Sequence, residues 1–525
     1  RCISGPTFRQ VCIKPQIPQF YAGKCIFITG ATGFMGKVLV ERLLWTCPDV
    51  GRIYLLMRQK KDVSPEKRLT QLKQSQVFDN IREKYPSQLD KLVMIPGDMT
   101  QPNLGIDSTY FIISQVSIVF HSAATLKFDE ALGKAVDQNV RSVMRLLDIC
   151  DRLPNIEAFI HVSTAYCNAD LVNVEEKVYT APASLDQVLA LTESVPEELV
   201  AEITQKYISP KPNTYTFTKA LAENAVEEHG NRGYPVAIFR PTIVISSLRH
   251  PFPGWIENLN GPSGVIVGAG KGLLHVFCCK NSARADLLPV DIAIDTLIAV
   301  AWETALDRLP EVRVYNCSTS DNPTTWRDFE NSIRRELRVH PLDKALWYPS
   351  GTSIESKHLQ RVLALLIQTV PLHLAEYTAR LLGIKTRLSF ITVSQRLHAM
   401  NKVLRFFSLR EWRFKKDNVR RLQARLSPQD AAIYNLDVQT IDWNEHYVNF
   451  VKGTRKYLLK EKDQDIDEAK RHIRKMFYLH HGFLAFLFVL LFRFAMQNPI
   501  IKGVIYGTLR LLFTIFNSAY SRIKL

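Results

Sequence analysis

The sequence has no CxxC pair and no regular spacing among its nine cysteines. A disulfide framework needs paired cysteines in an oxidising compartment, and a zinc site needs closely spaced ligands. Their odd number, and the position of Cys25 and Cys150 in apolar runs, indicate buried thiols in a reducing compartment. We therefore expect no disulfide and no metal site.

Two further features are missing. Residues 1–19 hold three prolines and no apolar run of the kind found in a secretory signal, so we expect a disordered leader there. No uninterrupted apolar run reaches the roughly 20 residues of a full membrane span. The longest, 483–492, lies in an apolar stretch, 476–496, that ends near Arg493.

Acidic residues are outnumbered by basic ones, and the 525 residues carry a formal net charge of +16. Much of this excess lies between residues 385 and 425. A basic patch can meet nucleic acid, an anionic membrane or a phosphate-bearing substrate, or it can be a solvated helical face. No zinc finger or RNP-type aromatic motif accompanies it, so we expect no nucleic-acid partner.

From residue 25 to about 320, short apolar segments alternate with segments of helical period. This alternation predicts βαβ units and an α/β fold with a doubly wound parallel Rossmann sheet, covered on both faces. A segment rich in Gly and Pro, 251–272, follows the sixth strand and is typical of a binding loop. The predicted strands are 25–29, 52–57, 92–95, 117–121, 157–163, 235–240 and 312–317.

With the leader counted as the first, the pattern divides the chain into four parts. After the leader we expect a reductase domain over 20–330, with a substrate loop at 250–290, and a C-terminal all-α domain over 340–462. A hydrophobic membrane-associated tail follows at 476–516. Its second apolar stretch contains Arg510, so a single span, a hairpin and an interfacial tail all remain open, with a buried helical hairpin as the alternative.

The first predicted strand runs into glycines at 30, 33 and 36, and an apolar helix face follows. Free N–H groups and the positive dipole end of such a helix bind a pyrophosphate, and glycines let the backbone come close. A plain structural turn is the alternative interpretation of a lone glycine loop. The expected dinucleotide contacts are Thr29, Gly30, Thr32, Gly33, Phe34, Met35 and Gly36.

The residues after the second predicted strand indicate which nicotinamide cofactor binds. An NAD site places Asp or Glu about 20 residues beyond the glycines. This chain has Arg58 there, followed by Lys60, and cations suit the 2′-phosphate of NADPH. Asp98, after the third strand, is expected at the adenine edge. Ala123 and Ala124, after the fourth, leave room for the cofactor.

Tyr215 and Lys219 are one helical turn apart, just after Asn213 and Thr214, either of which suits a helix cap. A free phenol with a pKa near 10 transfers protons poorly at neutral pH, and a neighbouring ammonium lowers that pKa. We expect Tyr215 to protonate an alkoxide as hydride arrives, and Lys219 to hold the nicotinamide ribose.

Ser163 and Thr164 end the fifth predicted strand, where ligands bind in such sheets. Thr164, or Ser163 beside it, is expected to hydrogen-bond the substrate carbonyl as negative charge develops. The alternative is a hydroxyl residue that only closes a strand.

The glycine loop, the hydroxyl pair, YxxxK and the strand order together resemble the extended short-chain dehydrogenase/reductase superfamily. Within it, the chain is similar to the alcohol-forming fatty acyl-CoA reductases from about Phe20 onward, through Trp443 in the helical part. Leu126, Lys127 and His250 depart from that pattern. The similar segments are 21–24, 29–36, 120–125, 161–166, 212–220, 251–255, 288–291 and 453–457.

This resemblance implies four-electron reduction of a long-chain fatty acyl-CoA to a fatty alcohol by NADPH, with release of CoA. It also implies a membrane anchor in the peroxisomal or endoplasmic-reticulum membrane and catalytic domains on the cytosolic side. Two alternatives are a membrane-bound reductase or epimerase acting on a sterol or nucleotide sugar, and a lipid-binding protein with a relic fold.

Overall fold

The computed structural model describes residues 15–499 except 61–62, 107–113, 231 and 385–388, and beyond them 501–503, 506–507, 510 and 513–514. Its centre is a parallel sheet of seven strands, and each lies within one residue of its predicted ends. In sheet order they are β12 (Arg313–Cys317), β7 (Val236–Pro241), β5 (Ala158–Val162), β4 (Val116–His121), β1 (Cys25–Thr29), β2 (Ile53–Met57) and β3 (Leu92–Pro96).

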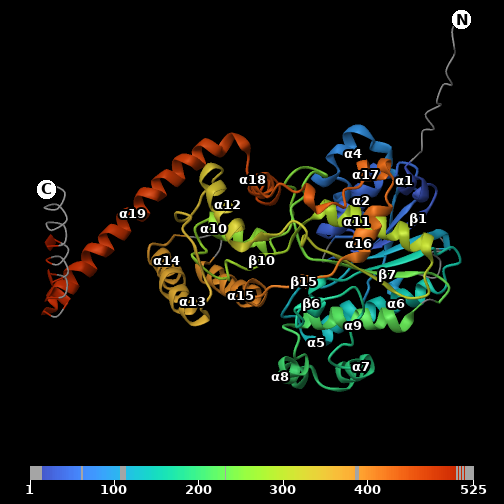
Figure 1. Cartoon of the computed structure of the whole chain (residues 1–525), viewed down its shortest axis with the longest axis horizontal. Coiled ribbons are helices and arrows are strands. Elements are labelled where there is room, and N and C mark those ends of the chain that lie inside the picture. Colours follow the sequence, from blue (N-terminus) through green and yellow to red (C-terminus); the bar gives the residue numbers. More distant parts are fainter. Residues whose placement is uncertain are drawn as a thin grey trace, which may run out of the picture.

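Helices cover both faces of this sheet (Figure 1). Successive strand residues point to opposite faces, so Ile26 and Ile28 belong to one buried cluster and Phe27 to the other. This is the doubly wound arrangement that the sequence predicts. On the first face lie α2 (Phe34–Thr46), α11 (Val290–Asp307) and α16 (Asp417–Arg425); on the second lie α5 (Leu132–Val136), α6 (Ser142–Cys150) and α9 (Thr214–His229).

The strand order reverses between β1 and β4. The loops that leave the carboxyl ends of β1, β4 and β5 therefore diverge from one edge of the sheet, and a crevice at such a switch point is where open α/β sheets bind ligands. The glycine loop follows β1, Ala123 and Ala124 follow β4, and the Ser163–Thr164 pair follows β5.

A further apolar cluster, distinct from the two on the faces of the sheet, lies beyond the sheet and includes Ile266, Phe329 and Phe450. The segment 251–272, expected to be a binding loop, contains a helix in this cluster, because Pro262 starts a run of small and apolar residues without a polar break. Elements of this part are β8 (Ile243–Ile245), α10 (Pro262–Gly270), β9 (Val276–Cys278), β10 (Arg284–Ala285), β11 (Leu287–Pro289), β13 (Thr324–Thr325), α12 (Trp326–Val339) and α18 (Trp443–Gly453).

The region 340–462 is mostly helical, as predicted, but it is not purely α. Two short strands, β14 (Thr352–Ile354) and β15 (Arg413–Phe414), pair with β9 and with β6 (Asn173–Val174). Strands of two or three residues are too short for an alternating pattern, so they could not be predicted from the sequence. The helices are α13 (Lys357–Ala364), the π-helical turn η7 (Leu365–Thr369), α14 (Val370–Leu381), α15 (Phe390–Ser408) and α17 (Pro428–Ile433).

The start of the described chain is ordered, which corrects part of the predicted leader. Helix α1 (Gln16–Tyr21) packs against α11, and Ile17 is fully buried. The Asp430 carboxylate, from α17, accepts hydrogen bonds of 3.0 Å from the backbone N–H groups of Gln16 and Ile17. A distant carboxylate caps this helix, so the local sequence could not reveal it. Residues 1–14 lie outside the described residues.

The apolar tail begins as part of a longer helix, α19 (Ile466–Gln497), which projects away from the sheet (Figure 1). Ala469 and Ile473 near its start are buried, and Trp347 Nε1 lies 2.8 Å from His480 Nδ1. Beyond that contact its side chains are exposed, including Phe488 and Phe494. Most of the predicted second stretch of the tail lies outside the described residues.

Candidate active site

The glycine loop leaves room that side chains would fill. Gly30 has a φ of +76°, and a Cβ atom there would lie 2.7 Å from the backbone nitrogen of Ala123. A Cβ atom at Gly36 would collide with the Gly30 carbonyl group. The loop therefore brings bare backbone to the N-terminus of α2, whose first N–H groups have no partner inside the helix. This cradle fits a dinucleotide pyrophosphate.

Several predicted contacts around this cradle hold the loop instead of facing open space. The Thr29 hydroxyl is buried, lies 2.8 Å from His121 Nδ1 and accepts a hydrogen bond of 3.2 Å from the N–H of Ala123. Phe34 stacks on Trp255 with ring centroids 5.2 Å apart, and Met35 packs against the core. Gly33 is the N-cap residue of α2.

Arg58 and Arg68 lie next to each other beside the glycine loop. Arg58 is exposed and lies 3.8 Å from Asp98, whose carboxylate also accepts hydrogen bonds from Thr100. Arg68 donates one hydrogen bond to the Arg58 carbonyl oxygen (2.6 Å) and another to the Thr32 hydroxyl (2.9 Å). Burial and the charge of Arg58 lower the pKa of Arg68. Two adjacent cations favour an anion between them.

Sequence reasoning missed Arg68. The signal is its place on α3 (Pro65–Lys73), capped by Ser64 and directly after the basic loop that follows β2. Lys60 is exposed and its backbone pairs with that of Val63. Its neighbour Lys61 lies outside the described residues. Ala123 and Ala124 are both partly buried in the loop after β4.

Helix α9 places Tyr215 in its first turn, because the Asn213 side chain accepts a hydrogen bond of 2.9 Å from the Thr216 N–H. The Tyr215 ring meets Phe128 edge to face, with centroids 5.4 Å apart. The Thr164 hydroxyl forms a side-chain hydrogen bond with Tyr215. Ser163, in contrast, is buried, and its Oγ has no hydrogen-bond partner in the described part of the chain. Of the two hydroxyls, only that of Thr164 is bonded to the tyrosine.

Burial raises the pKa of Tyr215 above its ordinary value of 10, Cys167 adds to the rise, and the hydrogen bond with Thr164 opposes it. This differs from the expectation that Lys219 would lower that pKa. The reason is that the Lys219 ammonium group is directed to the end of β5, where it donates a hydrogen bond of 2.8 Å to the Val162 carbonyl oxygen. Tyr215 is therefore a neutral phenol, the form that can donate a proton.

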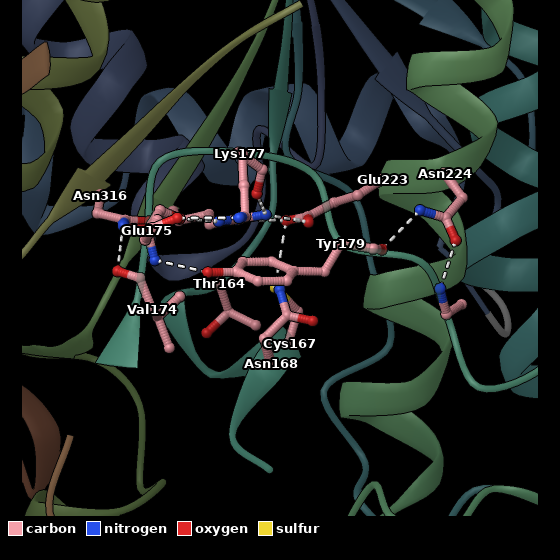
Figure 2. A network of polar contacts seen from close by, with 12 residues as sticks. Thr164, Cys167, Asn168, Val174, Glu175, Lys177, Tyr179, Glu223, Asn224 and Asn316 are labelled. Carbon is pink, nitrogen blue, oxygen red and sulfur yellow. Dashed lines mark hydrogen bonds and ion pairs between the residues drawn. The ribbon is translucent and has the colours of Figure 1, made fainter. Parts of the chain in front are cut away.

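Lys219 is buried, and burial lowers its pKa to about 8, while Glu223, one turn further along α9, raises it. Glu223 is itself buried and forms an ion pair with Arg240, with distances of 2.6 and 2.8 Å. The Cys167 thiol donates to the same carboxylate at 3.2 Å (Figure 2). This network lies behind the site and fixes α9 to β7. The sequence signal for this network was Glu223, an acidic residue one turn after Lys219 on a buried helix.

The buried side chains of His121 and His161 lie near Lys219, and their ring centroids are 5.2 Å apart. Burial, with Lys219 adding to its effect, lowers the pKa of His121 to about 3 and that of His161 well below 6.5. Both rings are therefore neutral. His121 ends β4 and contacts the Thr29 hydroxyl.

A cavity of about 1330 Å³ opens at the start of α9, where Asn213 and Thr214 line it and Tyr215 does not. Phe128, which contacts the Tyr215 ring, lines one side of it, and Lys402, Arg405 and Arg410 line another. The basic region thus faces a cavity next to the proposed proton donor and is more than a solvated helical face. The remaining walls come from α8 (Glu197–Tyr207), from the loop before α9, and from α13, η7 and α14; α7 (Leu185–Ser194) contributes Thr192.

Two parts of the chain match families described as male sterility protein. Residues 28–297 match its NAD-binding part, and residues 367–461 match a second part. The first match begins in β1 and ends in α11, so it covers the glycine loop, Thr164, Tyr215 and Lys219. The cradle therefore belongs to a nicotinamide-dinucleotide-binding domain.

Curated relatives match nearly the whole chain. Fatty acyl-CoA reductase 1 of Homo sapiens and that of Xenopus laevis are each 36% identical over 501 residues, which cover 95% of this chain and 97% of the relative. Fatty acyl-CoA reductase 2 of Bos taurus is 36% identical over 480 residues, covering 91% and 93%.

Solved structures share the fold. The terminal R domain of the myxalamid biosynthetic pathway has a TM-score of 0.55 and 18% identity, covering 84% of this chain and 93% of that one. The reductase domain of a nonribosomal peptide synthetase from Mycobacterium tuberculosis has a TM-score of 0.54 and 18% identity, covering 83% and 95%. These likenesses confirm the predicted Rossmann architecture.

Proposed function

The chain belongs to the fatty acyl-CoA reductase family, and from this premise we propose that it reduces a long-chain fatty acyl-CoA to the fatty alcohol with NADPH, releasing CoA. The observation that carries the proposal is the interacting pair of Thr164 and Tyr215, because the Tyr215 ring contacts Phe128 in the wall of the large cavity. A sterol or nucleotide-sugar reaction has no comparable support, because the curated relatives extend through the helical part that lines this cavity.

The charges beside the glycine loop favour NADPH over NADH as the cofactor. An NAD site would use a carboxylate after β2, whereas this chain places Arg58 there and adds Arg68 from α3. Asp98 pairs with Arg58, so its charge is offset. We infer that the two guanidinium groups hold the 2′-phosphate, with Thr32 at their side.

The chemistry follows from the neutral state of Tyr215. When bound, the reduced nicotinamide supplies hydride to the carbonyl carbon of the substrate. The Thr164 hydroxyl donates a hydrogen bond to the carbonyl oxygen, which stabilises the negative charge that develops there. Tyr215 donates its phenolic proton to that oxygen. Loss of the CoA thiol from the resulting hemithioacetal leaves an aldehyde, which makes the same two contacts in a second reduction.

Lys219 has a positioning role in this scheme. One of its N–H groups is fixed by the Val162 carbonyl oxygen, which leaves two for the nicotinamide ribose. The cavity takes the substrate. Lys402, Arg405 and Arg410 face it, none of them forms an ion pair with a carboxylate of the described residues, and phosphate groups of CoA are their natural ligands.

We further propose that α19 anchors the enzyme in the peroxisomal or endoplasmic-reticulum membrane, with the catalytic part in the cytosol. The most apolar window of this helix is not buried at all against the rest of the protein. Cytosolic placement suits the buried thiols and the supply of NADPH.

The test is a reaction of the purified full-length chain with palmitoyl-CoA and either NADPH or NADH, with products separated by chromatography. We expect hexadecanol, free CoA and oxidation of two NADPH per alcohol, with NADH a poor substitute. An aldehyde as the only product would limit the enzyme to one reduction. No product from any long-chain acyl-CoA would overturn the proposal.

A further inference from the structure

The segments α13, η7 and α14 form one continuous helix, Lys357–Leu381, whose polarity is reversed relative to an ordinary surface helix. Its large apolar side chains face outward, among them Leu366 (56% exposed), Leu374 (61%) and Leu381 (87%). A surface helix of a soluble protein turns such residues toward the core. The other exposed members of this outward face are Leu359, Val362, Leu365, Ile367, Val370 and Tyr377, followed by Leu382 and Ile384.

The inward face of this helix is polar. Gln368 and Glu376 are buried against the protein, where Gln368 accepts a hydrogen bond of 3.2 Å from the His275 N–H and Glu376 one of 2.7 Å from the Phe390 N–H. These bonds fix the helix on the protein with its apolar face outward. The exposed face is therefore built into the fold and is not a result of loose packing.

The whole helix has 25 residues and is long and apolar enough to cross a membrane by length and composition, but its charge-free part is shorter. Residues 362–375 contain no Asp, Glu, Lys or Arg. As a helix they extend about 21 Å, which is shorter than the roughly 30 Å of a bilayer core. Together with the bonds that hold the inward face, this length favours a helix that lies in a membrane surface.

Charges at the two ends fit the same partner. Lys357 and Arg361 at the start are exposed, and Arg380 at the end is 64% exposed. Cations that flank an apolar stretch reach lipid headgroups while the apolar side chains enter the acyl region. The helix Lys357–Leu381 and the apolar part of α19 both lie at the end of the molecule away from the sheet (Figure 1).

We propose that the helix formed by α13, η7 and α14 docks on the lipid bilayer as a second membrane contact, separate from α19. This helix also supplies Lys357, Thr369 and His373 to the wall of the cavity. Docking therefore brings the cavity to the membrane surface, where long acyl chains are found. The docking itself does not depend on the reaction assigned above.

The test measures the depth of one side chain in a vesicle. In the full-length chain, with Cys2 and Cys12 replaced by serine, Leu366→Cys is labelled with an environment-sensitive fluorophore. The protein is reconstituted in vesicles of phosphatidylcholine and phosphatidylserine, with or without brominated acyl chains. Asp186→Cys, exposed on α7, is the matched control, and Leu487→Cys on α19 reports the anchor.

We expect the brominated lipid to quench most of the emission at 366 and 487 and to leave that at 186 unchanged. Adding Leu374→Glu should reduce quenching at 366, while retained NADPH binding shows that the fold is intact. Quenching at 487 alone would overturn the proposal. So would emission at 366 that is insensitive to brominated lipid and instead changes with protein concentration, since this result would assign the face to a second copy of the chain.

Discussion

The Lys219 ammonium nitrogen lies 2.8 Å from the carbonyl oxygen of Val162. This bond ties α9 to the last residue of β5, directly before Ser163 and Thr164. The separation of Tyr215 and Thr164 therefore depends on a lysine whose hydrogen bond is to the Val162 backbone and to neither of these side chains. Lys219 orders the site through the backbone as well as through its charge.

Tyr215→Phe removes the proposed proton donor and keeps the ring that packs on Phe128. We expect turnover of palmitoyl-CoA to fall about 100-fold or more, because general acid catalysis is lost, while NADPH binding measured by fluorescence stays near that of the native protein. Tyr207→Phe on α8 is the control and should keep normal turnover. Near-normal alcohol formation by Tyr215→Phe would remove this residue from the mechanism.

Arg58→Asp and Arg68→Gln should both lower the preference for NADPH. The first introduces repulsion against the 2′-phosphate and the second removes one of two adjacent cations, so the ratio of kcat/KM for NADPH to that for NADH should drop about tenfold or more. Lys73→Gln, on the same α3 helix, is the control. If the ratio stays constant in both variants, the phosphate is bound elsewhere.

The pH dependence of the free energy of unfolding and of kcat/KM should reflect the charge of Lys219. Burial lowers its pKa in the folded chain to about 8 from 10.5, so its charge is lost as the pH rises through about 8. The unfolded chain binds more protons between these values, and the free energy of unfolding should rise with pH in that range. Over the same range kcat/KM for NADPH should fall, because the cation that holds the ribose is lost. Lys219→Met should show a low kcat/KM without this alkaline limb.

Glu223→Gln should destabilise the protein by about 3–5 kcal/mol, because it leaves the buried Arg240 guanidinium without its counter-charge. Urea unfolding measures this loss. Since Glu223 raises the pKa of Lys219, the alkaline limb should also move to lower pH. Glu193→Gln, in an exposed pair with Arg141, is the control and should change stability by less than about 1 kcal/mol. If the alkaline limb of kcat/KM does not move in Glu223→Gln, the Glu223–Arg240 network does not influence the site.

A chain that ends after residue 483 should lose its integral membrane attachment and keep its fold. This end preserves the packed start of α19, where Trp347 contacts His480 and Phe483. After a carbonate wash of membranes, the shortened chain should be soluble, while the full-length chain should need detergent. If the shortened chain also needs detergent, α19 is not the main anchor.

The sheet was predictable because its strands are buried on both faces and read as continuous apolar runs bounded by turn residues. The placement of Tyr215 in the first turn of α9 was predictable for a local reason as well, the Asn213 cap. The direction of the Tyr215 pKa was not, because it depends on burial by residues far apart in the sequence.

The helix Lys357–Leu381 shows the opposite limit. Its apolar stretch has a helical period, so the sequence indicates a helix there, but not which face is outward. That information lies in contacts such as the bond from the His275 N–H to Gln368, nearly one hundred residues apart. Arg68 was missed for a similar reason, since its partner Thr32 is on another element.

The cap of α1 by Asp430 has a consequence for synthesis. The carboxylate that receives the N–H groups of Gln16 and Ile17 is made more than four hundred residues after them. At usual translation rates that interval is about 20–80 s. During it the apolar side of Ile17 and Tyr21 has no completed site, so nascent chains should depend on chaperones until α17 has left the ribosome.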